Sequence, residues 1–145
     1  MTTGLDVFDT TLEQTNLWLK DVMDRCGFSD RHTAYQLLRA TLHAFRDRIG
    51  PVHAVHFAAQ LPMLIRGFYY EGWQPEKPIP KTRHAEDFLA AIEEAAGRTF
   101  GPDLKENVRT VFSVIADHID AQEFEKLRKV LPKDLHSLLQ EEFYL

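Results

Sequence analysis

Two histidines three residues apart are the first side chains in this sequence with types and spacing suited to chemistry. His53 and His56 would lie on one face of a helix, where their ring nitrogens could bind zinc or another divalent ion. His43 would complete a set of three only if the preceding helix turned its face toward the pair, and no acidic pattern stands beside them. The sequence predicts solvated surface histidines and no cofactor, with a metal site at His53 and His56 as the alternative.

The second candidate is the aromatic and charged stretch AAQLPMLIRGFYYEGWQP, residues 58–75. Arg66 and Tyr70 are one helical turn apart and Trp73 follows, and these three residue types are enriched among the residues that dominate protein interfaces. The alternative is a tyrosine whose ring packs in the core while its hydroxyl meets solvent. Arg66, Tyr70 and Trp73 are therefore predicted as a face that binds a protein partner or a second subunit.

The single cysteine, Cys26, is a weak candidate for a nucleophile, because no histidine and acid are placed to activate it. It precedes a glycine and is typical of a small apolar residue at a helix end. The sequence also lacks a nucleophile elbow, a phosphate-binding loop, a dinucleotide glycine pattern and a metalloprotease helix. A catalytic function is therefore less expected than a binding function.

The elements that must position these residues follow from an internal repeat. A shift of 70 residues aligns the sequence with itself without a gap. Identical pairs at this offset include Gly27 with Gly97, Arg39 with Arg109, Asp47 with Asp117, Pro62 with Pro132 and Glu71 with Glu141. Other pairs exchange one apolar side chain for another, such as Trp18 with Phe88, Phe45 with Ile115 and Trp73 with Phe143. The pattern predicts a duplicated unit.

The repeat divides one predicted compact domain, residues 1–145, into two units. Repeat 1 covers about 8–73 and repeat 2 about 84–143. The linker 74–83 between them is rich in proline, which favours an extended, non-helical path. Because a unit of this size would be only marginally stable alone, we expect the two units to share one core about a pseudo-twofold axis.

Each unit is predicted to contain four helices, eight in all, because apolar side chains recur at three- and four-residue spacing in matching segments. The two stripes are Ala34, Leu38, Leu42, Phe45 and Ile49 in the first unit and Leu104, Val108, Phe112, Ile115 and Ile119 in the second. No strand pattern competes with them. The predicted fold class is all-α, a duplicated four-helix unit that forms one compact bundle.

Cap residues predict where the striped helices begin and end. Ser29 is the expected N-cap of the first striped helix. Gly50 and Pro51 would end that helix and open the next one, since proline is tolerated in a first turn. Asp120 with Glu123 resembles a capping box at the matching place in the second unit.

Several other matched residues are expected to have structural roles. Pro62 and Pro132 would each end a helix and take the first position of the next, because proline cannot continue a helix without a clash. An arginine and an aspartate stand two turns apart on each striped helix, Arg39 with Asp47 and Arg109 with Asp117. That separation is too long for a bond within the helix, so ion pairs between helices or bonds at helix ends are expected in preference to a catalytic acid and base.

Composition argues against several classes of function. Seventeen Lys and Arg against 22 Asp and Glu give a net charge of −5, which opposes general binding to nucleic acid despite the local basic segments KTRH and EKLRKVLPK. The longest uncharged run, 49–65, is interrupted by two prolines, so no membrane span is expected. The acidic N-terminal segment lacks the features of a secretory signal and one cysteine cannot form an internal disulfide, so a cytoplasmic location is expected.

The segments LLRATLHAFRDRI, HFAAQLPMLIRGFYYEGW, VRTVFSVIADHI and LRKVLPKDLHSLL together resemble the bacterial domain-of-unknown-function family numbered 2267. The resemblance covers nearly the whole chain and is most specific in the long aromatic segment. It implies a small all-helical duplicated protein and no established activity, ligand or catalytic residue. The expected function is a protein-binding or regulatory module, self-association included. The alternative is a small metal-binding protein or enzyme that uses His53 and His56.

Overall fold

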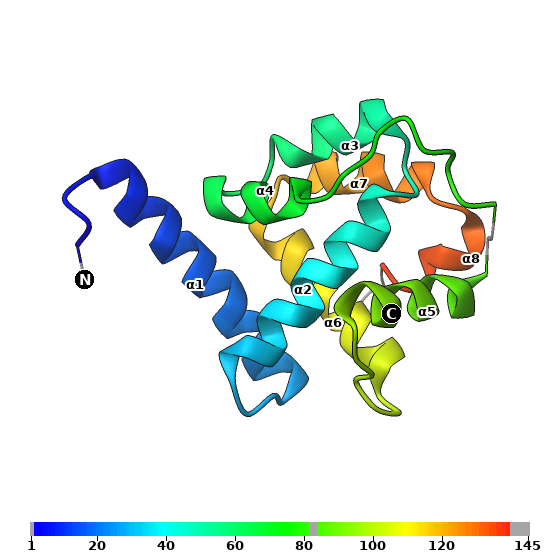
Figure 1. The fold of residues 1–145 in the computed structure, drawn as a ribbon, viewed down its shortest axis with the longest axis horizontal. Helices are drawn as coiled ribbons and strands as arrows, with labels where there is room; N and C mark the ends of the chain where they lie inside the picture. Colours follow the sequence, from blue (N-terminus) through cyan, green and yellow to red (C-terminus); the bar gives the residue numbers. More distant parts are fainter. Residues whose placement is uncertain (1, 82–83, 140–145) are drawn as a thin grey trace.

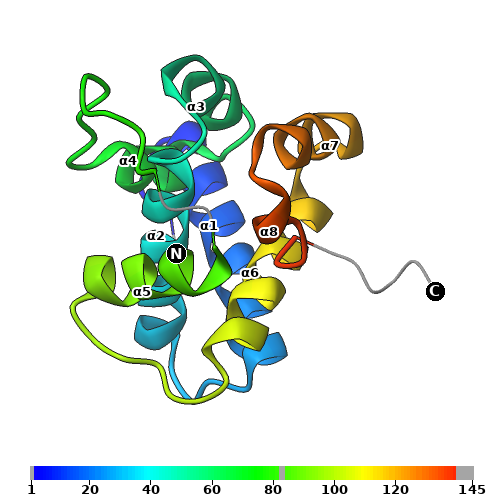
Figure 2. The same cartoon turned by 90° about the vertical axis from the view of Figure 1, so that its right-hand side faces the viewer.

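The computed structural model describes residues 2–81 and 84–139, which form eight α-helices and no strand (Figures 1 and 2). In chain order the helices are α1 (Asp6–Cys26), α2 (Arg31–Arg46), α3 (Pro51–Ala58), α4 (Met63–Tyr70), α5 (Ala85–Ala96), α6 (Leu104–His118), α7 (Ala121–Val130) and α8 (Lys133–His136). The all-α fold predicted from the sequence is confirmed. None of the helices in these ranges is long and apolar enough to cross a membrane.

One hydrophobic core is built from both halves of the chain. Helix α2 packs against α1, α4, α5 and α6, and α1 also packs against α6. At the centre, the Phe45 ring meets the Phe57 ring at a centroid distance of 5.1 Å and the Phe112 ring at 5.5 Å, both edge-on. Because Phe45 and Phe112 belong to different halves, each half completes the burial of the other.

The two predicted apolar stripes face this core. Ala34, Leu38, Leu42 and Phe45 of α2 are buried, and so are Val108, Phe112 and Ile115 of α6. Ile49 is also buried, although α2 has ended at Arg46. Leu104 and Ile119, at the two ends of the α6 stripe, are half-buried. Helical spacing therefore identified the buried faces, while tertiary contacts decided how far burial extends along each stripe.

The helix starts agree with the sequence at α3 and α7, whereas both ends of α2 differ: α2 ends at Arg46, before the predicted end at Gly50, which instead precedes α3. Pro51 occupies the first turn of α3, and the Asp120 carboxylate accepts hydrogen bonds from the backbone N–H groups that open α7. The N-cap of α2 is Asp30 and not Ser29, because the Asp30 carboxylate accepts from the Thr33 N–H at 2.8 Å. A carboxylate also interacts favourably with the positive end of the helix, which favours Asp30 over its neighbour.

Matched glycines follow helices, and matched prolines precede helices, at equivalent positions in the two halves. Gly27 and Gly97 follow α1 and α5 in the left-handed conformation, with φ of 76° and 69°, which glycine adopts without strain. Pro62 and Pro132 precede α4 and α8 with ψ of 153° and 148°. Each proline is thus the N-cap and not the first helical residue, one position earlier than predicted, because its extended ψ places it before the first helical turn.

The two halves also differ. Helix α1 has 21 residues and α5 has 12, and the first turns of α1 extend beyond the rest of the molecule in Figure 1. The ends of α1 and α5 and the starts of α3, α4, α7 and α8 recur at the 70-residue offset. Duplication, and the predicted limits 8–73 and 84–143, stay predictions. The pairs that involve Glu141 and Phe143, and the end of linker 74–83, lie outside the described residues.

Candidate functional site

A groove of about 360 Å³ lies between α1 and the segment that starts α4. Leu17 and Met63 line it, and these apolar side chains are 55% and 44% exposed. Arg66 and His118 line it as well, together with two glutamines. The hollow, termed the α1–α4 groove, thus combines exposed apolar surface with a cation and hydrogen-bonding groups, as protein-binding surfaces do.

His118 is a groove residue that the sequence did not indicate. Its Nε2 lies 2.8 Å from Asp21 Oδ2, and its ring stacks on Trp18 with centroids 5.0 Å apart. An imidazole held in this way can accept or donate a proton. The described residues that line the groove include no serine, threonine or cysteine to act as a nucleophile. Asp21 and His118 are 97 positions apart, so no local pattern could have found the pair.

The core-facing stripe of α1 continues past the part of the helix that the molecule covers. Thr11 and Trp18 are buried, whereas Val7 and Phe8, which extend the same helical spacing toward the N-terminus, are 50% and 47% exposed. Thr11 marks the boundary, because its hydroxyl accepts a hydrogen bond from the Leu64 N–H of α4 at 2.8 Å. Beyond this tie, the first turn of α1 presents apolar side chains to solvent.

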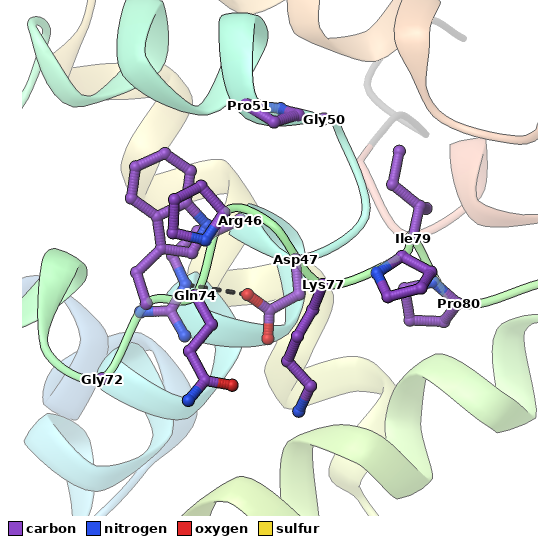
Figure 3. Close-up of a pocket in the computed structure, with 12 residues that line it drawn as sticks. Arg46, Asp47, Gly50, Pro51, Gly72, Gln74, Lys77, Ile79 and Pro80 are labelled. Atoms are coloured by element: carbon purple, nitrogen blue, oxygen red, sulfur yellow. Dashed lines mark hydrogen bonds and ion pairs between the residues drawn. The ribbon is translucent and has the colours of Figure 1, made fainter.

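A smaller cavity of about 140 Å³ lies where the end of α2 and the start of α3 face the linker (Figure 3). Arg46 and Asp47 line it at the end of α2, Trp73 lines it just before the linker, and Lys77 lines it from the linker. Arg46 is only 6% exposed, and its Nε donates to the Asp47 carboxylate at 2.9 Å. This hollow, termed the linker pocket, was not anticipated from the sequence.

Of the three predicted partner-binding residues, Arg66 and Trp73 line different hollows and Tyr70 lines neither. Arg66 lines the α1–α4 groove, and its guanidinium donates to the carbonyls of Ala58 and Leu61, at 3.2 and 3.0 Å, at the end of α3. Trp73 lines the linker pocket, and its ring lies 5.5 Å from that of the half-buried Tyr70. Of the three, only Arg66 therefore belongs to the groove.

His53 and His56 are exposed on α3 and line a hollow of about 200 Å³ that also touches α7. Glu123 lines the same hollow, but its carboxylate accepts a hydrogen bond from Lys126 at 3.2 Å. Across the two described ranges, no three or more His, Cys, Asp or Glu side chains form a group able to hold a metal ion. The geometry thus adds no third ligand to the histidine pair, and the metal-binding alternative stays a prediction.

The four matched charged residues all form ion pairs, and the partners of Asp47 and Asp117 differ between the two halves. The partners include Glu71 for Arg39 (3.0 Å), Arg46 for Asp47 (2.9 Å), Glu106 for Arg109 (3.4 Å) and Arg25 for Asp117 (2.8 Å). Arg39 reaches Glu71, the residue that follows α4, and Glu106, one partner of Arg109, lies on the same helix as Arg109. The structure does not bring the four residues into one site.

Cys26 is half-buried at the end of α1, and its Sγ lies 3.8 Å from the Asn107 carbonyl oxygen. Burial raises the pKa of the Cys26 thiol to about 11. The reactive form of cysteine is the thiolate, so this thiol is a poor nucleophile at neutral pH.

Comparison with protein families matches residues 15–138 to the family model DUF2267, described as an uncharacterized conserved protein. No curated protein matches the chain. The matched range begins within α1 and ends after α8, so it includes both halves of the core and every groove residue except Gln14. The description of the family names no activity.

Proposed function

We propose that this chain, which belongs to the DUF2267 family of uncharacterized conserved proteins, is a protein-binding module that associates with a second copy of itself. The surface it uses is the first turn of α1 together with the α1–α4 groove. This surface supplies contact area and charge and needs no catalytic group. The proposed compartment is the cytoplasm, where a free thiol such as Cys26 stays reduced.

The observation that supports the proposal is the uncovered apolar stripe of α1. Val7 and Phe8 continue the spacing of the buried Thr11 and Trp18, yet each is about half exposed. Removing apolar surface from water is worth about 25 cal/mol per Å². A partner that covers this turn removes its apolar surface from water, which stabilises the complex relative to the separate chains. Apolar patches of this kind, rimmed by polar residues, commonly mark association sites.

A second copy fits this surface because one chain contains both sides of the contact. If two α1 helices lie antiparallel, Phe8 of one copy can lie against Met63 in the groove of the other. The same contact forms in reverse, which makes the interface isologous.

Charge supports the antiparallel arrangement. The first turn of α1 has two acidic residues, Asp6 and Asp9, and the groove has the exposed Arg66. In an antiparallel pair the acidic turn of one copy approaches the Arg66 of the second copy. A parallel pair would place like acidic turns together, which costs free energy.

Sedimentation velocity over a range of protein concentrations tests the proposal. We expect the wild-type chain to dimerise, and Phe8→Glu or Met63→Glu to raise the dissociation constant by about tenfold or more, because each places a charge in the apolar contact. Both positions lie in first turns, where an acidic residue favours the helix.

Val52→Glu is the matched control. Val52 is 65% exposed in the first turn of α3, so it receives the same change outside the proposed surface. Thermal unfolding of each variant separates lost association from lost folding. A wild-type chain that stays monomeric at every concentration, or folded Phe8→Glu and Met63→Glu variants that dimerise as tightly as Val52→Glu, would refute the proposal.

A further inference from the structure

The linker pocket contains a buried cation with an unused donor group. Arg46 Nη1 donates to the carbonyl oxygens of Tyr69 at 2.7 Å and Glu71 at 2.9 Å, and Nε donates to Asp47. Within the described residues, no hydrogen bond uses the second amino group, Nη2. A guanidinium can donate five hydrogen bonds, so Arg46 can donate further bonds in addition to those it makes to the carbonyls at the end of α4.

The unused Nη2 group retains exposed surface, and Arg46 lines the pocket. Among the described residues, the buried side-chain nitrogen and oxygen atoms without a partner are the hydroxyl oxygens of Thr15 and Thr41. Arg46 Nη2 is therefore not sealed in the core, and the hollow that Arg46 lines is the linker pocket. A side chain that is 6% exposed overall thus presents one donor group at the pocket wall.

Two further charges lie around the same cavity. Asp47 is held by Arg46 while its side chain remains 46% exposed, and Lys77 is an exposed residue of the linker. In Figure 3, the Asp47 carboxylate lies among the side chains of Arg46, Lys77 and Gln74. The pocket therefore offers cationic donors and an anionic acceptor close together.

The remaining walls are apolar and stiff. Prolines 51, 75, 78 and 80, the Ile79 side chain and the Trp73 ring line the cavity. Proline has a fixed φ, so these walls lose little freedom when a ligand binds. The cavity of about 140 Å³ is close to the size of an engineered cavity that admits benzene, so a ligand of about six non-hydrogen atoms fits.

We propose that the linker pocket binds a small zwitterion, such as a free amino acid with a short side chain. The ligand carboxylate lies against Arg46 Nη2 and the Lys77 ammonium, and the ligand ammonium lies against the Asp47 carboxylate. The short side chain contacts the proline and tryptophan walls. A simple anion fits less well, because the Asp47 carboxylate repels it, and a simple cation meets Arg46 and Lys77.

This site is separate from the surface proposed for self-association, since it lies at the opposite end of α4 from Met63. Each proposal therefore stands or fails alone. Binding at the linker pocket would join the end of α2 to the linker between the two halves of the chain.

Heteronuclear NMR titration of the full chain with L-alanine, acetate and methylammonium tests the site. We expect L-alanine to shift the Trp73 indole and the Gln74 and Lys77 amide signals saturably, and to bind about tenfold or more tightly than either single-charge probe. The Trp18 indole, which lines the α1–α4 groove, serves as an internal reference and stays in place.

Lys77→Gln removes one contact at an exposed position, so the variant retains its fold. It should weaken L-alanine binding by about fivefold or more, a difference of about 1 kcal/mol. Lys105→Gln, an exposed lysine on α6 outside the pocket, should bind as the wild type does. The proposal is overturned by the absence of saturable shifts at Trp73, by acetate binding as tightly as L-alanine, or by equal binding in the two lysine variants.

Discussion

At the scale of single residues, His43 shows how a side chain suited to chemistry becomes part of the core. It is 8% exposed, and its Nε2 lies 2.7 Å from the Phe68 carbonyl oxygen, which joins α2 to α4. Burial lowers the pKa of His43 most; the hydrogen bond with the Phe68 carbonyl and the Asp47 charge raise it, and the charges of Arg46 and Arg39 lower it further. The neutral ring is therefore the form that the fold accommodates.

The pH dependence of stability follows from this lowered pKa. As pH falls below the ordinary histidine value of about 6.5, the unfolded chain binds a proton that folded His43 does not. The free energy of unfolding should therefore decrease as pH falls from that value toward the lower folded pKa, and should gain nothing from His43 above it. Urea denaturation at a series of pH values measures this slope.

Comparing two variants isolates the contribution of His43. His43→Gln keeps a donor for the Phe68 carbonyl and removes the titration, so its stability should fall less steeply with acid than that of the wild type. His32→Gln, at an exposed position of the same helix, should keep the wild-type slope. Equal slopes in the wild type and His43→Gln would show that His43 does not carry this dependence.

At the scale of helices, two aspartates in N-cap positions differ in what they bond. The Asp120 carboxylate accepts from the backbone N–H groups of Gln122 at 2.8 Å and Glu123 at 3.3 Å. Asp103 occupies the same position before α6 without a side-chain cap bond. Asp120→Ala should therefore lower the free energy of unfolding by about 1 kcal/mol.

Asp103→Ala is the matched control for that cap. With no cap bond to lose, it should change stability by less than about 0.5 kcal/mol. Chemical denaturation of both variants at one pH gives the comparison. If the two substitutions cost the same, the hydrogen bonds of the Asp120 carboxylate contribute nothing measurable to α7.

The helices were predictable because their signals are local. Apolar spacing, Pro51 and Asp120 act within one or two turns, so the sequence indicates them directly. The candidate sites were less predictable because they depend on distant pairs. Arg46 binds the carbonyl of Tyr69, 23 positions away, and His118 binds Asp21, 97 positions away. Only packing brings such residues together, so the linker pocket and the groove had no signal in the chain.

Arg66 and Tyr70 illustrate the same limit. Their helical spacing correctly placed them on α4. It could not show that the Arg66 guanidinium turns toward the Ala58 carbonyl, or that the Tyr70 ring packs beside Trp73. The Ala58 carbonyl accepts from the Leu61 N–H at 3.0 Å, and a carbonyl at a helix end can accept a second donor such as the Arg66 guanidinium.

At the scale of the whole molecule, the shared core makes the two halves interdependent. Phe45 of the first half contacts Phe112 of the second, and α2 packs on both α5 and α6. We expect residues 1–79 and 80–145, produced separately, to show little helix by circular dichroism, because each exposes the face that the other covers. Mixing the two should restore helical signal and one cooperative unfolding transition.

A separate half with native-like helix and its own cooperative transition would contradict this expectation. Phe112→Ala in the intact chain provides an independent measurement. It should cost about 3–5 kcal/mol by removing a ring from the centre of the shared core. If the two halves had separate cores, Phe112→Ala would shift the unfolding transition of the second half alone. With one shared core, the whole chain should unfold in a single transition at a lower temperature.

If the chain self-associates through the first turn of α1 as proposed, the length difference between α1 and α5 limits how large the assembly can become. Of the two matched helices α1 and α5, only α1 has the overhanging first turn, because α1 has 21 residues and α5 has 12. A molecule with one such overhang has one surface through which it can associate with another copy. When two copies bind each other through this surface, no association surface is left exposed, so the assembly is a closed dimer. With a second overhang on α5 the same chemistry would propagate into a polymer whose length rises with concentration.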